Sequence, residues 1–236
     1  MIHMTKEELD AILNKSLREI AIIKTNWIIL NGLKEAMQEG AEYEMLLDIS
    51  PCFWSTTLNN LSSNVLMKTA KIYDEHKDCI GLKKIINICE QNQELFPKKH
   101  TVTCTDGDTG EKCSFDMKKD VCKDIRDAQH KYQELYDARM QLMTLRDKYL
   151  AHTDKRIFLD VKSFYQEVAF KQETIEILIK TAGDIFNSFL SDLSNTTVPL
   201  EFDNADDYEK MLRYAKDGKE AFLQRIKSRA NHRLRE

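Results

Sequence analysis

The sequence has few residues that break helices and no long apolar run. Of its 236 residues, only three are proline and seven are glycine. No apolar run reaches the roughly 18 residues that a transmembrane helix needs. The opening MIHMTKEELD shows no basic segment followed by an apolar one, so no secretory signal is expected. These absences predict a cytoplasmic protein without a membrane span, whose six cysteines are free thiols rather than a disulfide framework.

The sequence also lacks the motifs of several common enzyme classes. It contains no GxxxxGK(S/T) phosphate loop, no GxGxxG fingerprint, no GxSxG elbow and no HExxH pair. A formal net charge of -4 argues against broad electrostatic binding of nucleic acid, which needs many phosphate-neutralising cations, and DNA is not an expected partner. A small local site for an anionic ligand remains open.

Long stretches rich in good helix formers predict an all-α protein, a multi-helix bundle in one domain over residues 1–236. Thr5 and Glu8 have the spacing of a capping box at the start of the first helix. Apolar residues recur at steps of three and four residues. Helices are therefore expected over residues 5–38, 54–76, 82–93, 117–152, 172–193 and 203–229, with a short strand or an extended crossing at 156–161.

One segment, near residues 96–116, breaks the helical pattern and predicts a short hairpin or loop insertion. A zinc site is an alternative there, with ligands from His100, Cys104, Cys113 and Cys122. The C-x8-C spacing lacks the close cysteine pairs typical of structural zinc sites. Asp106, Asp108 and Gly110 resemble part of a calcium loop without its remaining ligands. A polar turn is the better interpretation, and no metal or cofactor is expected.

The last residues, 225–236, are basic, with five Arg or Lys side chains against Glu236. Cations suit the C-terminal end of a helix because they oppose its dipole. A tail that contacts RNA or a partner is the alternative interpretation.

The helix expected over residues 117–152 ends in the most informative stretch of the chain, LRDKYLAHTD at residues 145–154. Its apolar seam recurs at three- and four-residue steps through Leu135, Ala138, Leu142, Leu145 and Tyr149. Three residues further, the seam reaches His152, where packing favours an apolar side chain. A structural interpretation remains open, in which Arg146 and Asp147 form surface ion pairs and His152 ends the helix.

Arg146 follows the seam on its flank, six residues before His152. On a straight helix that separation is about 9 Å of rise and about 120° of rotation, too far for both groups to hold one atom. If a second copy packed against the seam, two arginines and two histidines would converge between the chains. The pattern therefore favours a composite site in a homodimer.

Such a site suits RNA cleavage by transesterification. An imidazole titrates near neutral pH and can relay protons, while a guanidinium binds phosphate oxygens in bidentate fashion. The attacking group would be the 2'-hydroxyl, so the substrate would be RNA.

Residues 146–152, RDKYLAH, resemble the R-x(4-6)-H signature of the HEPN superfamily, which often has an acidic or polar residue directly after the arginine, as Asp147 is here. The segment RDKYLAHTD, residues 146–154, is most similar to the abortive-infection branch of that superfamily. The resemblance implies an all-α bundle that dimerises through its motifs and acts as a metal-independent endoribonuclease in phage defence or a toxin–antitoxin system. It implies that Arg146 and His152 are catalytic and that Asp147 positions them.

The resemblance leaves other residues in weaker roles. Lys148, Lys155 and Arg156 are candidates for substrate binding, and an antitoxin protein is a conceivable partner. Relatives that a nucleotidyltransferase modifies carry a tyrosine two positions after the histidine, but Asp154 stands there in this chain. The alternative function is a non-catalytic RNA-binding or helical protein-interaction module.

Overall fold

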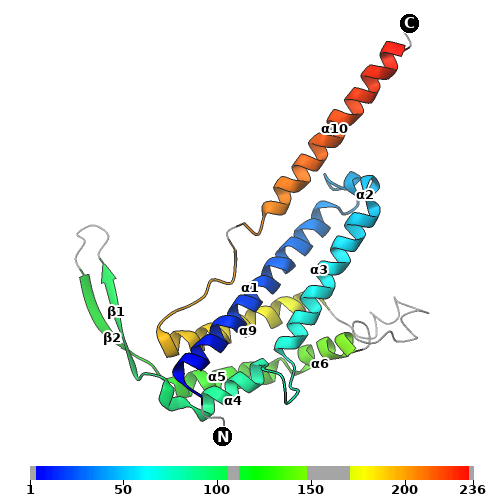
Figure 1. Ribbon diagram of the computed structural model, residues 1–236. Helices are drawn as coiled ribbons and strands as arrows, with labels where there is room; N and C mark the ends of the chain where they lie inside the picture. The colour runs from blue at the N-terminus through cyan, green and yellow to red at the C-terminus, as the bar shows by residue number, and fades with distance from the viewer. Residues whose placement is uncertain (1–3, 106–111, 148–170, 203, 234–236) are drawn as a thin grey trace. The chain divides into compact units, whose positions relative to one another are not determined.

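The computed structural model describes residues 4–105, 112–147, 171–202 and 204–233 (Figure 1). This part of the chain forms helices and one two-stranded hairpin, which confirms the all-α class with an insertion near residues 96–116. None of the described helices combines the length and apolar character that a bilayer span requires. The elements are α1 (Lys6–Ala36), α2 (Met45–Ile49), α3 (Pro51–Ile72), α4 (Leu82–Gln91), η1 (Gln93–Leu95), β1 (Lys99–Thr105), β2 (Lys112–Lys118), α5 (Val121–Glu134), α6 (Tyr136–Leu145), α9 (Gln172–Ser194) and α10 (Asp207–Arg233).

Helix α1 starts with the predicted reciprocal cap. The backbone amide of Glu8 donates to Thr5 Oγ1 at 3.2 Å, and that of Thr5 donates to Glu8 Oε2 at 2.8 Å. The capping box satisfies two amides at the end of the helix. After the helix, Gly40 has a φ of 78°, a left-handed conformation that glycine adopts without strain.

The contacts of the chain divide it into two compact units. Unit 1 is Met1–Ile23 with Leu66–Leu200, and unit 2 is Lys24–Val65 with Glu201–Glu236. Two of the three boundaries fall inside continuous helices, since α1 and α3 each contribute to both units, and the third, between Leu200 and Glu201, lies between α9 and α10. The expectation of a single domain over residues 1–236 therefore stays a prediction.

The core of unit 1 is formed by apolar faces of its helices. Leu9, Leu13, Leu17 and Ile20, spaced by four, four and three residues, line one face of α1 and are fully buried. Phe189 of α9 is equally buried. Full burial of one such side chain contributes about 1.5–3 kcal/mol, so this core fixes the helices that carry the polar residues described below.

The core of unit 2 is smaller. Its buried residues are Leu33, Met37, Leu46, Trp54 and Leu212. Tyr208 of α10 lies so close to Gly32 of α1 that a Cβ at Gly32 would collide with the phenol ring. Only the first half of α10 is anchored in this way, because residues 220–229 are all exposed.

The helix predicted over residues 117–152 is confirmed over most of its described length, but its start and its continuity are wrong. Residue 117 belongs to β2, and helix begins only at Val121, where Asp120 caps it by accepting from the Lys123 amide at 3.1 Å. The helix is interrupted again at Leu135, whose φ of -83° and ψ of 9° separate α5 from α6. A continuous apolar pattern does not reveal this break, because the seam residues on both sides of it are packed.

The second predicted helix, residues 54–76, is also shifted. Helix α3 begins at Pro51, where proline suits the first turn of a helix, and ends at Ile72. Residues 74–76 therefore lie in the following turn, where the backbone amide of His76 donates to Asp74 Oδ1 at 2.9 Å. This turn brings two adjacent carboxylates against α5 and α6.

The predicted insertion is an antiparallel hairpin. Its register pairs Lys99 with Lys118 and Cys104 with Cys113. The side chains of His100, Cys104 and Cys113 are not among those that the structure describes, so the zinc alternative stays a prediction. Within the described residues, no group of three or more His, Cys, Asp or Glu side chains could hold a metal ion.

Candidate functional site

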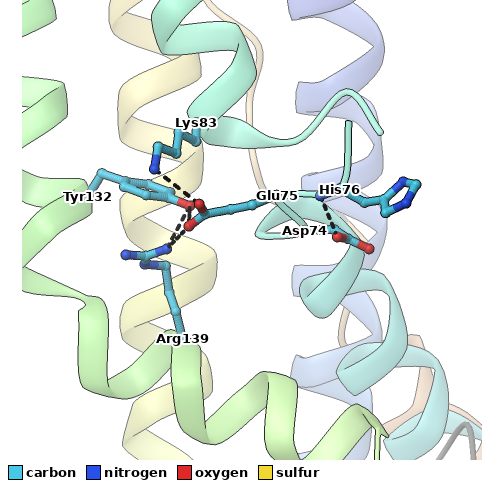
Figure 2. Close-up of polar contacts among 6 residues, drawn as sticks. All are labelled: Asp74, Glu75, His76, Lys83, Tyr132 and Arg139. Carbon is cyan, nitrogen blue, oxygen red and sulfur yellow. Dashed lines mark hydrogen bonds and ion pairs between the residues drawn. The ribbon is translucent and has the colours of Figure 1, made fainter. Parts of the chain in front are cut away.

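The carboxylate of Glu75, in the turn after α3, is the centre of a polar cluster in unit 1. Its Oε1 accepts from Arg139 Nη1 at 2.6 Å and from the Tyr132 hydroxyl at 2.9 Å, while Oε2 accepts from Lys83 Nζ at 3.0 Å. Figure 2 shows these three donors, from α4, α5 and α6, converging on one carboxylate. The imidazole of His76 points the opposite way in the same view. Glu75 thus links three helices to the end of α3.

Arg139 is the most deeply buried cation of this cluster. Its side chain is only 10% exposed. The guanidinium carbon lies 3.8 Å from the ring centroid of Tyr132, a cation–π contact, and Nη1 also donates to the Tyr132 hydroxyl at 2.7 Å. Its buried Nε has no hydrogen-bond partner among the residues that the structure describes. The charge of Arg139 therefore depends on Glu75 for compensation.

The protonation of Glu75 reflects this environment. Burial alone would raise its pKa, but hydrogen bonds from Lys83, Tyr132 and Arg139 outweigh burial, and the net effect is a lowered pKa. For Tyr132 the signs differ: burial and the hydrogen bond to Glu75 raise the pKa of its hydroxyl. At neutral pH Glu75 is consequently a carboxylate and Tyr132 a neutral phenol.

Arg146, the first residue of the predicted motif, is held between two carboxylates next to this cluster. Its Nη1 donates to Asp74 Oδ2 at 3.0 Å, and its Nε donates to Asp147 Oδ1 at 2.7 Å. The hydrogen bond that Arg146 donates to Asp147 is the main cause of a raised pKa of Arg146, with further contributions from the charges of Asp147 and Asp74. The guanidinium is therefore charged and fixed on two edges, and its Nη2 has no partner among the described residues.

The two arginines form a ladder with the two acids. Arg139 and Arg146 are seven residues apart and so lie about two turns apart on one helix face, given that Arg146 keeps helical angles (φ -56°, ψ -54°). Arg139 pairs with Glu75 and Arg146 with Asp74. The two adjacent acids thus hold α6 and its last described turn, which carries Arg146, in a fixed position relative to the end of α3.

The structure describes two of the predicted site residues. Arg146 and Asp147 are in contact, whereas His152 lies outside the described residues. The proposed substrate-binding residues lie outside them as well: Lys148, Lys155 and Arg156.

The seam does not offer a free face for a second copy where the structure describes it. Leu142 and Leu145 are 0% and 1% exposed within one chain, and α6 contacts α9. The expectation that a partner packs directly onto these seam residues is therefore wrong for this stretch. Any contact between two motifs has to begin at or beyond Arg146.

Sequence reasoning missed the residues that hold Arg146 and its neighbours. These residues are Asp74, Glu75, Lys83, Tyr132 and Arg139. A signal was present: two arginines seven residues apart beside an apolar seam, and two adjacent acids directly after another helix. The pairing between them depends on where α3 ends, which the sequence pattern misplaces by four residues.

A second buried acidic group lies elsewhere in unit 1. Asp192 of α9 is 2% exposed and its Oδ1 lies 3.0 Å from Lys119 Nζ. Burial, and then a hydrogen bond to Asp192, raises the pKa of Asp124 to about 6. Burial also raises the pKa of the Cys89 thiol to about 12, with a further contribution from the charge of Asp192. This group fastens α9 to α5 and to the end of β2.

A family model described as AbiU2 (HEPN_AbiU2) matches residues 6–212 of the chain. The matched range includes the Asp74–Glu75 turn and the whole RDKYLAH stretch. No curated protein and no solved structure matches the chain.

Proposed function

The chain belongs to the AbiU2 family of HEPN abortive-infection proteins, and on that premise we propose that it is a metal-independent endoribonuclease acting in phage defence or a toxin–antitoxin system. The observation that carries the proposal is the guanidinium of Arg146. Two carboxylates fix it at the start of the motif, and among the described residues Nη2 has no acceptor. A cation whose orientation is set before the substrate arrives stabilises developing charge without a reorganisation cost.

The proposed reaction is an attack of the RNA 2'-hydroxyl on the adjacent phosphorus. The bond from the 2'-oxygen to phosphorus forms and the bond from phosphorus to the 5'-oxygen breaks. His152 takes the proton of the 2'-hydroxyl, and a protonated imidazole supplies one to the leaving 5'-oxygen. The products are a 2',3'-cyclic phosphate and a 5'-hydroxyl. Arg146 neutralises the charge that builds on the phosphate oxygens.

In this proposal Asp147 and Asp74 position Arg146, because each accepts one of its N–H groups. Lys148, Lys155 and Arg156 would contact the RNA backbone. Since Arg146 and His152 are too far apart on one helix to grip the same phosphate, the histidine would come from a second copy. That copy would approach beyond Leu145, because the seam before it is covered.

The test is incubation of the purified chain with total RNA in excess EDTA, followed by analysis of the product ends. We expect cleavage that leaves 2',3'-cyclic phosphates and a loss of about 100-fold or more in Arg146→Ala and His152→Ala. Arg126→Ala and His130→Ala are matched controls, since both side chains are exposed on α5. Equal cleavage by His152→Ala and wild type would refute the nuclease proposal.

A non-catalytic HEPN module is the second candidate, and one observation favours it. Arg146 already has two carboxylate partners, so its charge is largely compensated within the chain. A module that binds RNA without turnover predicts RNA retention by wild type, weaker retention by Arg146→Ala, and no new RNA ends. A protein-interaction module predicts no effect of either motif variant on RNA retention.

A further inference from the structure

Helix α10 carries an exposed face that the core of unit 2 does not use. The face consists of seven exposed positions: Asp207, Met211, Tyr214, Gly218, Phe222, Arg225 and Arg229. At 100° per residue they fall in a sector about 80° wide, centred on Gly218. Leu212, which packs in the unit 2 core, lies about 120° further round the helix. The face is therefore available while α10 stays anchored.

The face exposes large apolar side chains to solvent. Tyr214 is 73% exposed, Phe222 62% and Met211 43%. Clusters of exposed apolar side chains bounded by charges are typical of protein interaction sites. Between the two aromatic residues, a Cβ built on Gly218 would have no atom within 4 Å. Nothing in the part of the chain that the structure describes thus requires a glycine at this interior helical position, where glycine is unfavourable.

The order of residues on this face is symmetric about Gly218. The steps between successive positions are four, three, four, four, three and four residues. Reversing the order places Tyr214 on Phe222, Met211 on Arg225 and Asp207 on Arg229. Every position thus meets a chemically suitable partner: aromatic on aromatic, methionine on an arginine stem, acid on cation.

We propose that this face, named here the Gly218 face, binds the same face of a second copy, with the two α10 helices antiparallel about a two-fold axis at Gly218. A two-fold contact must be self-complementary, which the reversed order provides. Glycine at the axis lets the two backbones approach and the flanking rings of the partner pack beside it. Asp207 faces the partner's Arg229, and by symmetry the pair occurs twice. A parallel arrangement would instead place like charges together.

The existing partner of Asp207 does not compete strongly with this contact. Its Oδ1 accepts from Lys210 Nζ at 2.7 Å within the same helix, and both side chains are more than half exposed. Such exposed pairs are weak and rearrange easily. The Gly218 face includes neither Arg146 nor His152, so the inference stands apart from the proposed nuclease.

A charge-exchange experiment on the full chain tests the proposal. Association is measured by energy transfer between separately donor- and acceptor-labelled chains. We expect wild type to associate, and Asp207→Arg or Arg229→Asp alone to weaken self-association about tenfold, because attraction becomes repulsion at two symmetric positions. A mixture of the two variants, and the double variant D207R/R229D, should recover wild-type affinity to within about threefold.

Glu209→Arg is the matched control. It makes the same charge change in the same first turn, but about 200° round the helix, and should leave association unchanged. Gly218→Leu should weaken association at least as much as Asp207→Arg does, without lowering the thermal midpoint, because the site is open within one chain. No association of wild type at tens of micromolar would overturn the proposal and assign the face to a different partner. Equal association in every charge combination would also overturn it, since a dimer through another face does not respond to these charges.

Discussion

Exchange of Glu75 for glutamine removes the charge that compensates Arg139, and the structure predicts the size of the effect. Breaking a fully buried ion pair costs about 3–5 kcal/mol, since the remaining charge lies in a poor solvent. Arg139 is 10% exposed, but the Glu75 side chain is 46% exposed, so water screens part of the interaction. We therefore expect Glu75→Gln to lower the free energy of unfolding by about 2 kcal/mol.

Substitution of the other partner of this ion pair, Arg139, has a smaller effect. Arg139→Met keeps an apolar side chain against Tyr132, and Glu75 retains Lys83 and access to water. The variant loses a cation–π contact and two hydrogen bonds, to Glu75 and to Tyr132, but it no longer buries a charge, so the net loss is about 1 kcal/mol. The double variant leaves no buried charge and should also lose about 1 kcal/mol, so the coupling energy is about 2 kcal/mol.

Urea unfolding of the four proteins, followed by circular dichroism, measures this cycle. Glu134→Gln, on an exposed carboxylate of α5, is the control and should change stability by less than about 0.5 kcal/mol. Because the pKa of Glu75 is lowered in the folded protein, its charge stabilises the fold at pH values above the ordinary pKa of 4.5. This stabilisation is lost as the pH falls below that value. The difference between wild type and Glu75→Gln should consequently shrink in acid. A coupling energy under about 0.5 kcal/mol at pH 7 would show that Glu75 does not compensate the charge of Arg139.

Three further predictions concern other parts of the chain. The raised pKa of Asp124, about 6, means that the folded state binds more protons than the unfolded state between pH 4 and 6. The stability of the wild type therefore falls as pH rises through that window. Asp124→Asn should raise the unfolding free energy at pH 7.5 by about 1 kcal/mol, after allowance for solvent screening, and by nothing at pH 4. Gly81→Ala should cost about 1–3 kcal/mol by urea unfolding, because its Cβ would collide with the backbone of the turn after α3, whereas Gly218→Ala has open space and should not destabilise. The Cys89 thiol should resist alkylation in the folded protein at pH 8, as peptide mass spectrometry would show, and rapid labelling would contradict its burial.

Helix existence could be predicted well from the sequence because it depends on local patterns. The capping box of Thr5 and Glu8 and the stripe that follows specify α1 with signals inside one segment. The breaks were harder to predict. The interruption at Leu135 falls where both flanking helices continue the apolar seam, so periodicity carries no sign of it.

The candidate site was predicted only where its residues are neighbours in sequence. Arg146 and Asp147 are adjacent, and their contact follows from that adjacency. Asp74 and Glu75 are more than sixty residues away along the chain, and their approach depends on how α3, α5 and α6 pack. Contacts set by tertiary packing are not encoded in any local pattern that a single sequence displays.

We propose above that the RDKYLAH stretch cleaves RNA. The number of new 2',3'-cyclic phosphate ends in RNA incubated with the purified chain and EDTA measures this cleavage. We expect such ends with wild type and His130→Ala, and their loss with His152→Ala. Folded wild-type protein that yields no new ends, or His152→Ala protein that yields as many as wild type, would contradict this proposal.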